Sequence, residues 1–292
     1  MKKTLFAGLL ACLLTLTACG TAPAQPAPEG EDTLRILATT YPVYLFTTAV
    51  TEGVEGVRVD LLVNQQTSCL HDYTLTVTDM KAIEGADVVV MNGAGLEDFM
   101  SDALAATDAA VIDCSEHIGL LTLPDGDSDP HIWMTEAGAT AMMNNILAGI
   151  SALDEAHRDA YTENCEAAAA LLPGNPLAGK ALAHPYLITF HDGFQYFAQA
   201  NGLTLLKSIE EEEGSEASAK EINEIVSLIR DYGVPAIFTE VNGSDATAQA
   251  IARETGAEVR QLDMIMSGAG SGIQPYIDAM KANYDTILEA LG

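Results

Sequence analysis

Four side chains suited to metal binding stand where predicted strands lead into turns. Three are histidines, whose neutral imidazole is the commonest protein ligand for metals such as zinc, and the fourth is an aspartate. In α/β proteins, ligands bind at the carboxyl ends of the strands, so side chains at these positions are expected to meet. The four residues are His71, His131, His191 and Asp263.

Three imidazole nitrogens and one carboxylate oxygen complete the four-coordinate shell that zinc prefers. Taken singly, a histidine is more often packed or exposed than a ligand, and this sequence has no compact motif of two histidines on one helix. Imidazole must be neutral to bind, so affinity should fall as the pH drops through about 6.5, the ordinary histidine pKa. The other histidines, His117, His157 and His184, lack comparable surroundings and are expected to be structural or exposed.

Short apolar or β-branched runs predict strands in both halves of the chain. Segments with helical spacing separate them, and strands that alternate with helices imply a parallel sheet. The runs are 34–38, 57–63, 87–91 and 109–112 in the first half, and 186–190, 203–206, 236–239 and 257–262 in the second. We predict two α/β lobes with parallel sheets, over residues 33–134 and 174–292.

A short internal repeat favours two similar lobes over one continuous sheet. The strand and turn that end in Met91-Asn92-Gly93 in the first half resemble Val241-Asn242-Gly243 in the second. Matches this short arise by chance, so the repeat supports only the two-lobe arrangement.

The segment between the lobes, residues 135–173, predicts a single long linking helix. It is rich in alanine, its apolar residues have helical spacing, and Pro173-Gly174 ends it. One helix of this length would be a rigid backbone between the lobes. Two shorter helices with a break near Gly149 are the alternative.

The first eighteen residues have the pattern of a signal peptide. Lys2 and Lys3 precede an apolar stretch that is too short for a permanent membrane helix. The ending Leu16-Thr17-Ala18-Cys19 resembles a bacterial lipobox, in which Cys19 becomes the lipid-modified first residue. An ordinary signal peptide with an incidental cysteine is the alternative. Residues 19–32, rich in Pro, Ala and Glu, are expected to be a tether.

Acidic residues dominate the chain, which has a formal net charge of −29. This charge argues against nucleic acid and anionic lipid surfaces as partners and favours cations near the protein. Solubility alone would also explain it.

Three cysteines remain beyond the lipobox in an exported, disulfide-permissive setting. Cys69 and Cys114 each follow a predicted strand of the first half, and we propose a disulfide between them. Cys165 would then be an unpaired residue of a helix.

The sequences around the three histidines are specific in combination. They are Leu70-His71-Asp72-Tyr73, Asp129-Pro130-His131-Ile132-Trp133 and Thr189-Phe190-His191-Asp192-Gly193. In order and separation they resemble the signature stretches of bacterial zinc and manganese solute-binding proteins of ABC importers. The resemblance extends over nearly all of the chain beyond the tether. Cys69-Leu70 departs from the family pattern, in which a small residue and a proline often precede the first histidine.

The resemblance implies a lipid-anchored receptor on the outer face of the cell membrane, which binds a divalent metal and delivers it to an ABC permease. Metal would be held between the lobes by the residues matching His71, His131, His191 and Asp263. Glu240 matches a family glutamate and could be a metal ligand or a hydrogen-bond acceptor for a ligand imidazole. We favour the acceptor role. The protein is expected to be a monomer and not an enzyme.

The residue type at position 191 indicates which metal the site prefers. Family members suited to manganese tend to have a carboxylate there, and an imidazole-rich site fits Zn²⁺ better than Mn²⁺. We therefore expect zinc, with manganese as the alternative. Two other functions stay open, a metal-dependent hydrolase and a surface adhesin that uses metal structurally. Four protein ligands would leave no open position for the water of a hydrolase.

Overall fold

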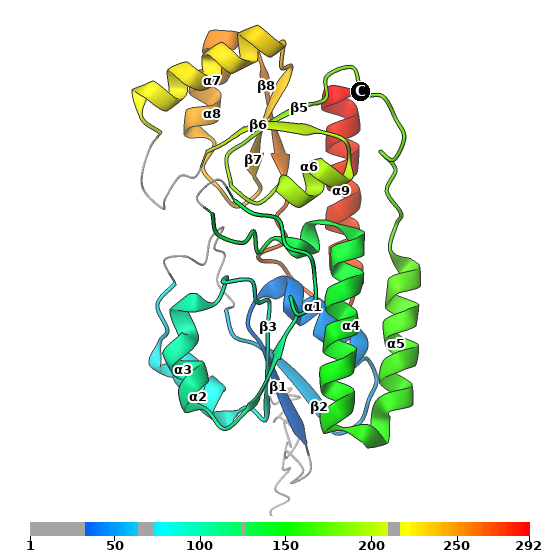
Figure 1. Ribbon diagram of the computed structural model, residues 1–292. Coiled ribbons are helices and arrows are strands. Elements are labelled where there is room, and N and C mark those ends of the chain that lie inside the picture. The colour runs from blue at the N-terminus through cyan, green and yellow to red at the C-terminus, as the bar shows by residue number, and fades with distance from the viewer. Residues whose placement is uncertain (1–32, 64–72, 124–125, 210–216) are drawn as a thin grey trace, which may run out of the picture. The chain divides into compact units, whose positions relative to one another are not determined.

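Two four-stranded parallel sheets organise the chain (Figure 1). The computed structural model describes residues 33–63, 73–123, 126–209 and 217–292. These sheets confirm the predicted fold class of two α/β lobes. The first sheet has the order β2-β1-β3-β4, with β1 (Leu34–Ala38), β2 (Val57–Leu61), β3 (Val88–Met91) and β4 (Ala110–Asp113). The second has the order β6-β5-β7-β8, with β5 (Tyr186–Thr189), β6 (Thr204–Ser208), β7 (Ala236–Glu240) and β8 (Glu258–Leu262).

The shared strand order creates a switch point in each lobe. The chain goes from the first strand of a lobe to a neighbour on one side, and then returns to a strand on the other side. The direction of the connections therefore reverses between β1 and β3, and between β5 and β7. Such a reversal leaves a crevice at the carboxyl ends of the two strands. In the second lobe, His191 follows β5 and Glu240 ends β7.

Helices connect the strands, and several begin at side-chain caps. Thr76 and Asp79 form a capping box at the start of α2, and Ser218 and Glu221 form another at the start of α7. The connecting helices are α1 (Tyr41–Val50), α2 (Val77–Gly85), α3 (Ser101–Ala106), α6 (Gln195–Ala200), α7 (Ala219–Tyr232), α8 (Ala246–Thr255) and the C-terminal α9 (Gln274–Leu291).

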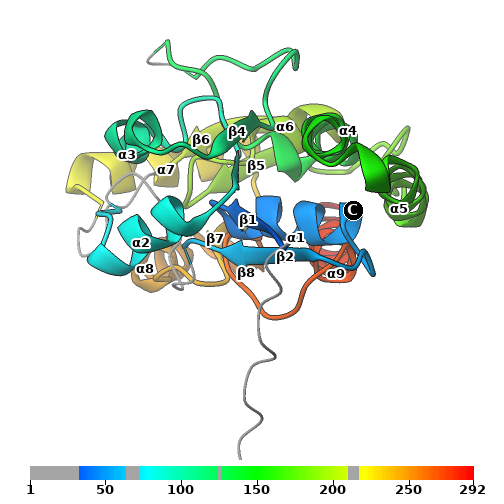
Figure 2. The same cartoon turned by 90° about the horizontal axis from the view of Figure 1, so that it is seen from below.

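The prediction of a single long helix over residues 135–173 is wrong. The segment folds into α4 (Glu136–Leu153) and α5 (Arg158–Leu171), which lie side by side (Figures 1 and 2). Asp154 leaves the helical conformation, and a short 3₁₀ turn, η3 (Glu155–His157), reverses the chain. The Asp154 Oδ2 atom accepts hydrogen bonds from His157 Nδ1 at 2.7 Å and Tyr161 Oη at 2.6 Å. This carboxylate stabilises the turn, so the break comes at Asp154 and not near Gly149.

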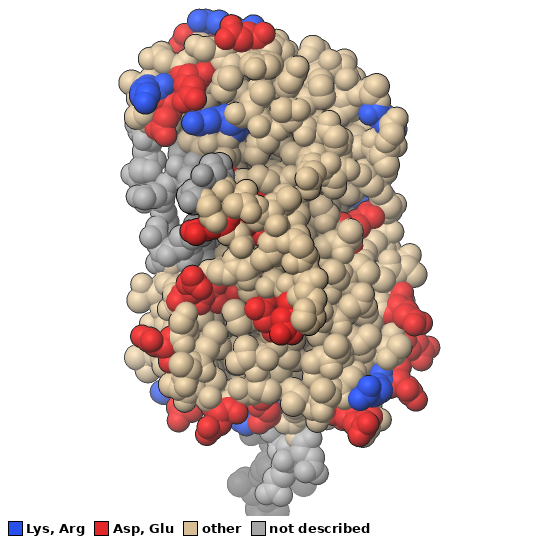
Figure 3. Space-filling view, viewed as in Figure 1, with Lys and Arg blue, Asp and Glu red and all other residues tan. Residues whose placement is uncertain are grey.

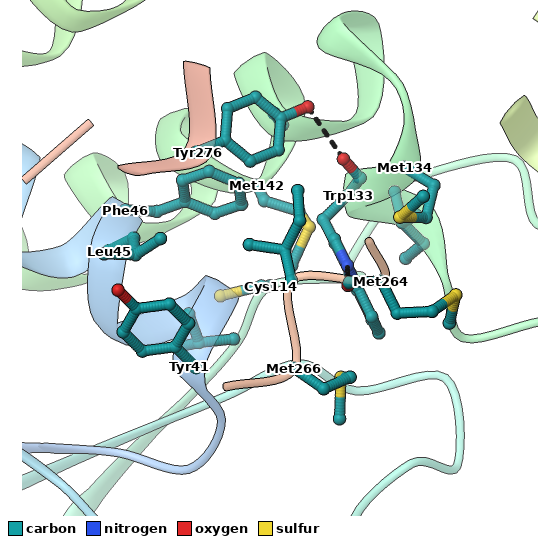
Figure 4. Close-up of a cluster of buried hydrophobic side chains, with 14 of the residues drawn as sticks. Tyr41, Leu45, Phe46, Cys114, Trp133, Met134, Met142, Met264, Met266 and Tyr276 are labelled. Atoms are coloured by element: carbon teal, nitrogen blue, oxygen red, sulfur yellow. Dashed lines mark hydrogen bonds between the residues drawn. The ribbon is translucent and has the colours of Figure 1, made fainter. Parts of the chain in front are cut away.

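One hydrophobic core joins segments from both halves of the chain (Figure 4). Phe46 of α1 and Tyr276 of α9 pack edge to face with ring centroids 5.1 Å apart. Trp133 is fully buried beside them, in the 3₁₀ turn η2 (Ile132–Met134). Its indole Nε1 donates to the carbonyl of Met264 at 2.8 Å, and the Tyr276 hydroxyl donates to the Trp133 carbonyl at 2.8 Å. The segments after His131 and after Asp263 are therefore bound to each other.

The surface of the described part is acidic with few basic groups. On the face shown in Figure 3, several basic side chains lie at the end of the molecule that carries α7 and α8, and acidic side chains are scattered over the lobe that carries α2 and α3. Within the described residues, no helix is both long enough and apolar enough to span a membrane.

Candidate metal centre

The structure brings together two of the three predicted histidine ligands. His131 precedes η2 and is 5% exposed, and His191 follows β5. Their rings meet edge to face with centroids 5.8 Å apart. Because His131 comes from the first half of the chain and His191 from the second, the pair joins the two halves. His71 lies outside the described residues.

His131 is oriented by a carboxylate that the sequence analysis did not assign to the site. Asp129 is fully buried, and its Oδ1 atom lies 2.8 Å from His131 Nδ1 and accepts from the His131 backbone N–H at 2.9 Å. A carboxylate at Nδ1 favours the tautomer with its proton there, which leaves the lone pair of Nε2 for a metal. The position of Asp129, two residues before the histidine, is the feature of the sequence that could have indicated this role.

The backbone around Asp129 is itself fixed. Its N–H donates to the Leu121 carbonyl at 2.8 Å, and its carbonyl accepts from the Tyr196 hydroxyl at 3.3 Å. The same hydroxyl accepts from the Leu121 N–H at 2.9 Å. Tyr196 belongs to α6 of the second lobe, so this lobe also positions the histidine of the first.

Glu240 faces His191 from the end of β7, the strand beside β5. Its Oε2 atom lies 3.8 Å from His191 Nδ1. The carboxyl is 3% exposed, and neither of its oxygens has a hydrogen-bond partner among the described residues. Burial, together with the nearby Asp263, raises the pKa of Glu240 to about 8. A buried carboxylate without donors is costly, and a cation beside it would offset that cost.

Asp263 follows β8 and is held by backbone contacts. Its Oδ1 atom accepts from the Ile265 N–H at 2.7 Å. Ile265 has a φ of 62°, which is unfavourable for a β-branched residue and marks a strained turn next to the aspartate. Burial raises the pKa of the Asp263 carboxyl. The charge of Asp263 also contributes to the raised pKa of Glu240.

Gly193 makes room for His131. A Cβ atom at this position would lie 2.2 Å from Met264 Cε, 2.8 Å from His131 Cδ2 and 2.9 Å from His131 Nε2. Only a residue without a side chain lets the imidazole pack this closely on the turn that follows His191. A side chain at this position would also crowd Nε2 of His131, the atom that a metal would contact.

Within the described residues, no three His, Cys, Asp or Glu side chains converge closely enough to hold a metal ion. His131 contacts His191, and His191 in turn lies beside Glu240. They do not form a complete coordination shell by themselves.

The two cysteines of the described part, Cys114 and Cys165, are buried and are not bonded to each other. Cys114 is fully buried in the core, where burial raises the pKa of its thiol well above the ordinary value. Its proposed disulfide partner, Cys69, lies outside the described residues, so the pairing stays a prediction. Cys165 is free, as expected, and lies in α5. Cys19, the predicted lipid attachment point, also lies outside the described residues.

The family of the chain follows from comparison with known proteins. The family described as zinc-uptake complex component A, periplasmic, matches residues 36–290. The chain belongs to this family. Its members are metal-binding receptors of ABC importers, which confirms the predicted resemblance and the prediction of a binding protein rather than an enzyme.

Relatives of the chain carry names for different metals. It is 26% identical over 310 residues to the high-affinity zinc uptake system protein ZnuA of Bacillus subtilis, covering 97% of this chain and 96% of that protein. It is 27% identical over 310 residues to the manganese-binding lipoprotein MntA of the same species, covering 100% of both. A solved structure, the laminin-binding protein of Streptococcus agalactiae, is described as bifunctional, with adhesin and metal transporting activity. It matches with a TM-score of 0.77 at 26% identity, covering 89% of this chain and 100% of that one.

Proposed function

We propose that the chain captures Zn²⁺ and delivers it to the permease of an ABC importer. The observation that carries this proposal is the His131–His191 pair, in which imidazoles from the two lobes lie 5.8 Å apart. A metal held between them would also be close to the buried Glu240 carboxyl, whose oxygens lack hydrogen-bond donors among the described residues. Imidazole nitrogen and one or two carboxylate oxygens are suited to zinc.

The proposed ligands are His71, His131, His191 and Asp263, with Glu240 as the acceptor that orients His191. The approach of Glu240 Oε2 to His191 Nδ1 at 3.8 Å supports this role for Glu240. Asp129 supports His131 in the same way through the contact at Nδ1. With Nδ1 facing a carboxylate in both rings, each imidazole would offer Nε2 to the ion.

Manganese is the alternative cargo, and the MntA relative is named for that metal. Mn²⁺ prefers oxygen ligands, whereas the described part of this site contains two imidazoles. The chemistry of the described side chains therefore favours zinc.

We further propose that the mature protein is a monomer anchored to the membrane through a lipid on Cys19. The relative MntA of Bacillus subtilis is named a lipoprotein, which supports an anchor in this chain. A Cys19→Ala variant expressed in a bacterial host should be released from the membrane fraction. Retention of the variant in that fraction would contradict the anchor.

The cargo is tested by competition. Purified protein from residue 33 onward, freed of metal, should bind one Zn²⁺, and excess Mn²⁺ should not displace it. His131→Ala and His191→Ala should each weaken zinc binding strongly. His157→Ala is the control, because His157 contacts Asp154 in the turn between α4 and α5. Displacement of zinc by equimolar manganese, or wild-type affinity in both variants, would overturn the proposal.

A further inference from the structure

Two buried asparagines contact the backbone of the residues that carry the proposed ligands. Asn92 is fully buried in the turn after β3, and Asn283 is 1% exposed in the middle of α9. One acts on the segment of His131 and the other on Asp263. We propose that Asn92 and Asn283 are positioning residues of the metal site. The inference rests on the proposed ligand roles of His131 and Asp263.

Asn283 pairs with both backbone polar groups of Asp263. Its Oδ1 atom accepts from the Asp263 N–H at 2.7 Å, and its Nδ2 atom donates to the Asp263 carbonyl at 2.8 Å. Asp263 comes directly after the last residue of β8, where the pairing with β7 ends. The side-chain amide thus takes the place of a neighbouring strand for one more residue. The N–H and the carbonyl of Asp263 are therefore both fixed before the chain enters the strained turn at Ile265.

The position of Asn283 in its helix supports a role beyond folding. The other buried side chains of α9 are aliphatic, Met or Tyr, which suits a helix in a core. Asparagine is a poorer helix former than leucine or methionine, and an amide is costly to bury unless it is hydrogen-bonded. Here both amide groups are used, and both contact the same residue.

Asn92 acts on the peptide group between Pro130 and His131. Its Nδ2 atom donates to the Pro130 carbonyl at 3.0 Å and to the Gly93 carbonyl at 3.0 Å. The Pro130 carbonyl also accepts from the Ile132 N–H at 2.8 Å, and His131 has φ −81° and ψ 43°. These values are close to an inverse γ-turn centred on the histidine. Asn92 therefore fixes the carbonyl of that turn, and Asp129 fixes the N–H of His131 at its centre.

A buried carboxylate holds Asn92 in place. Glu97 Oε1 accepts from the Asn92 N–H at 2.7 Å and from the Thr39 hydroxyl at 2.6 Å, and Oε2 accepts from the Gly93 N–H at 3.0 Å. Thr39 follows β1 and Asn92 follows β3. The switch point of the first lobe is thus filled by a network that ends on the His131 segment, 38 residues further along the chain.

The test compares metal binding with folding in the same variants. Asn92→Ala and Asn283→Ala should each weaken Zn²⁺ binding by about tenfold, as is usual when a group that orients a ligand is lost. The Co²⁺-loaded variants should also show an altered visible absorption spectrum, because the ligand geometry changes. A purely structural role would lower the melting temperature of the metal-free protein without moving either reading.

Asn164→Ala is the matched control. Asn164 Nδ2 donates to two backbone carbonyls, those of Val50 at 3.1 Å and Glu52 at 2.8 Å, and contacts no ligand-bearing segment through these bonds. This variant should lower the melting temperature but keep wild-type zinc affinity and the wild-type Co²⁺ spectrum. The positioning roles are overturned if Asn92→Ala and Asn283→Ala bind zinc within threefold of wild type.

Two milder substitutions replace the alanine variants if those variants fail to fold. Asn92→Ser keeps a small polar group, and Asn283→Asp keeps an acceptor for the Asp263 N–H while removing the donor. The same loss of affinity is expected, and the same wild-type affinity would overturn the inference. If the wild-type protein itself binds neither zinc nor manganese, the proposed function fails instead. The two failures are therefore distinguishable.

Discussion

At the scale of single residues, the candidate site depends on neighbours that bind no metal. The imidazole of His131 is oriented by Asp129 and packs on a turn whose glycine leaves space for it. These contacts involve only protein groups and would restrict the imidazole to one orientation. Preorganisation of this kind favours tight binding because less ordering is required on association.

Gly193→Ala tests the close approach of the histidine to this turn. The added methyl would overlap Met264 Cε and the imidazole of His131, so the ring must move away from its present position. We expect zinc affinity to fall by at least about tenfold, measured by competition with a chelating dye. Gly119→Ala is the control, because a Cβ at Gly119 would meet nothing within 4 Å. Equal affinity in both variants would contradict the packing argument.

Glu97 should make the stability of the metal-free protein depend on pH. Burial raises the pKa of its carboxyl from 4.5 to about 7. Between these values the folded protein keeps a proton that the unfolded chain releases. This contribution to stability is therefore complete below pH 4.5 and is lost as the pH rises through 7. A shift of this size corresponds to about 3 kcal/mol.

The measurement is urea unfolding of the metal-free wild type and of Glu97→Gln at several pH values from 4.5 to 8. Glutamine has no proton to release. The free energy of unfolding of Glu97→Gln should therefore fall less over this pH range than that of the wild type. Above pH 8, where Glu97 is ionised, the free energy of unfolding should change with pH equally in both proteins. Parallel pH profiles from 4.5 to 8 would show that the Glu97 carboxyl does not cause the effect.

At the scale of elements, the turn between α4 and α5 decides how the two lobes are connected. Asp154 accepts two side-chain hydrogen bonds there, from His157 and Tyr161. Desolvation raises the pKa of Asp154, but the hydrogen bonds from Tyr161 and His157, together with the charge and backbone N–H of His157, bring the pKa below the ordinary value. The ionised form is therefore the one that stabilises the turn.

Asp154→Ala should destabilise the protein by about 1–3 kcal/mol, because a charged acceptor of two hydrogen bonds is removed. Chemical denaturation at pH 7 checks the value. Asp159→Ala, in the first turn of α5, is a comparison that removes a carboxylate from the same region. A loss below 0.5 kcal/mol for Asp154→Ala would show that the turn is held by packing of α4 on α5 alone.

The strands could be predicted from the sequence, whereas the linking helix could not. Apolar runs such as 34–38 and 236–239 correspond closely to the buried strands β1 and β7, because a strand inside a parallel sheet needs apolar residues on both faces. The alanine-rich segment has helical spacing on both sides of Asp154. Spacing gives no sign of the reversal, since the hydrogen bonds that stabilise it depend on residues brought together by the turn.

The candidate site shows the same limit. His131, His191 and Asp263 could be located because each follows a predicted strand or turn or belongs to a specific motif. Asn283 could not, because its partner lies 20 residues earlier and its helix pattern resembles that of any core helix. Contacts of this kind depend on the packing of α9 beside β8, which local sequence does not encode.

At the scale of the whole molecule, the two lobes share a core. One hydrophobic cluster contains β1 and α1 residues of the first lobe together with Leu187, Phe238 and Leu262 of the second. A second cluster, around Ile225 and Ile237, is confined to the second lobe. Because the larger cluster is continuous, residues 33–292 should unfold as one cooperative unit.

Trp133 allows this cooperativity and metal binding to be tested together. It is the only tryptophan of the chain and is fully buried, with its ring centroid 5.2 Å from that of His131. Its fluorescence and the far-UV circular dichroism should follow the same unfolding curve in urea. Zinc at about 100 times its dissociation constant should move both curves together, by about 2.7 kcal/mol. His191→Ala should remove the shift at the same zinc concentration, because a ligand that binds only weakly cannot stabilise the folded state. Two separate transitions, or a zinc shift seen by only one probe, would mean that the lobes unfold independently and that the ion does not bridge them.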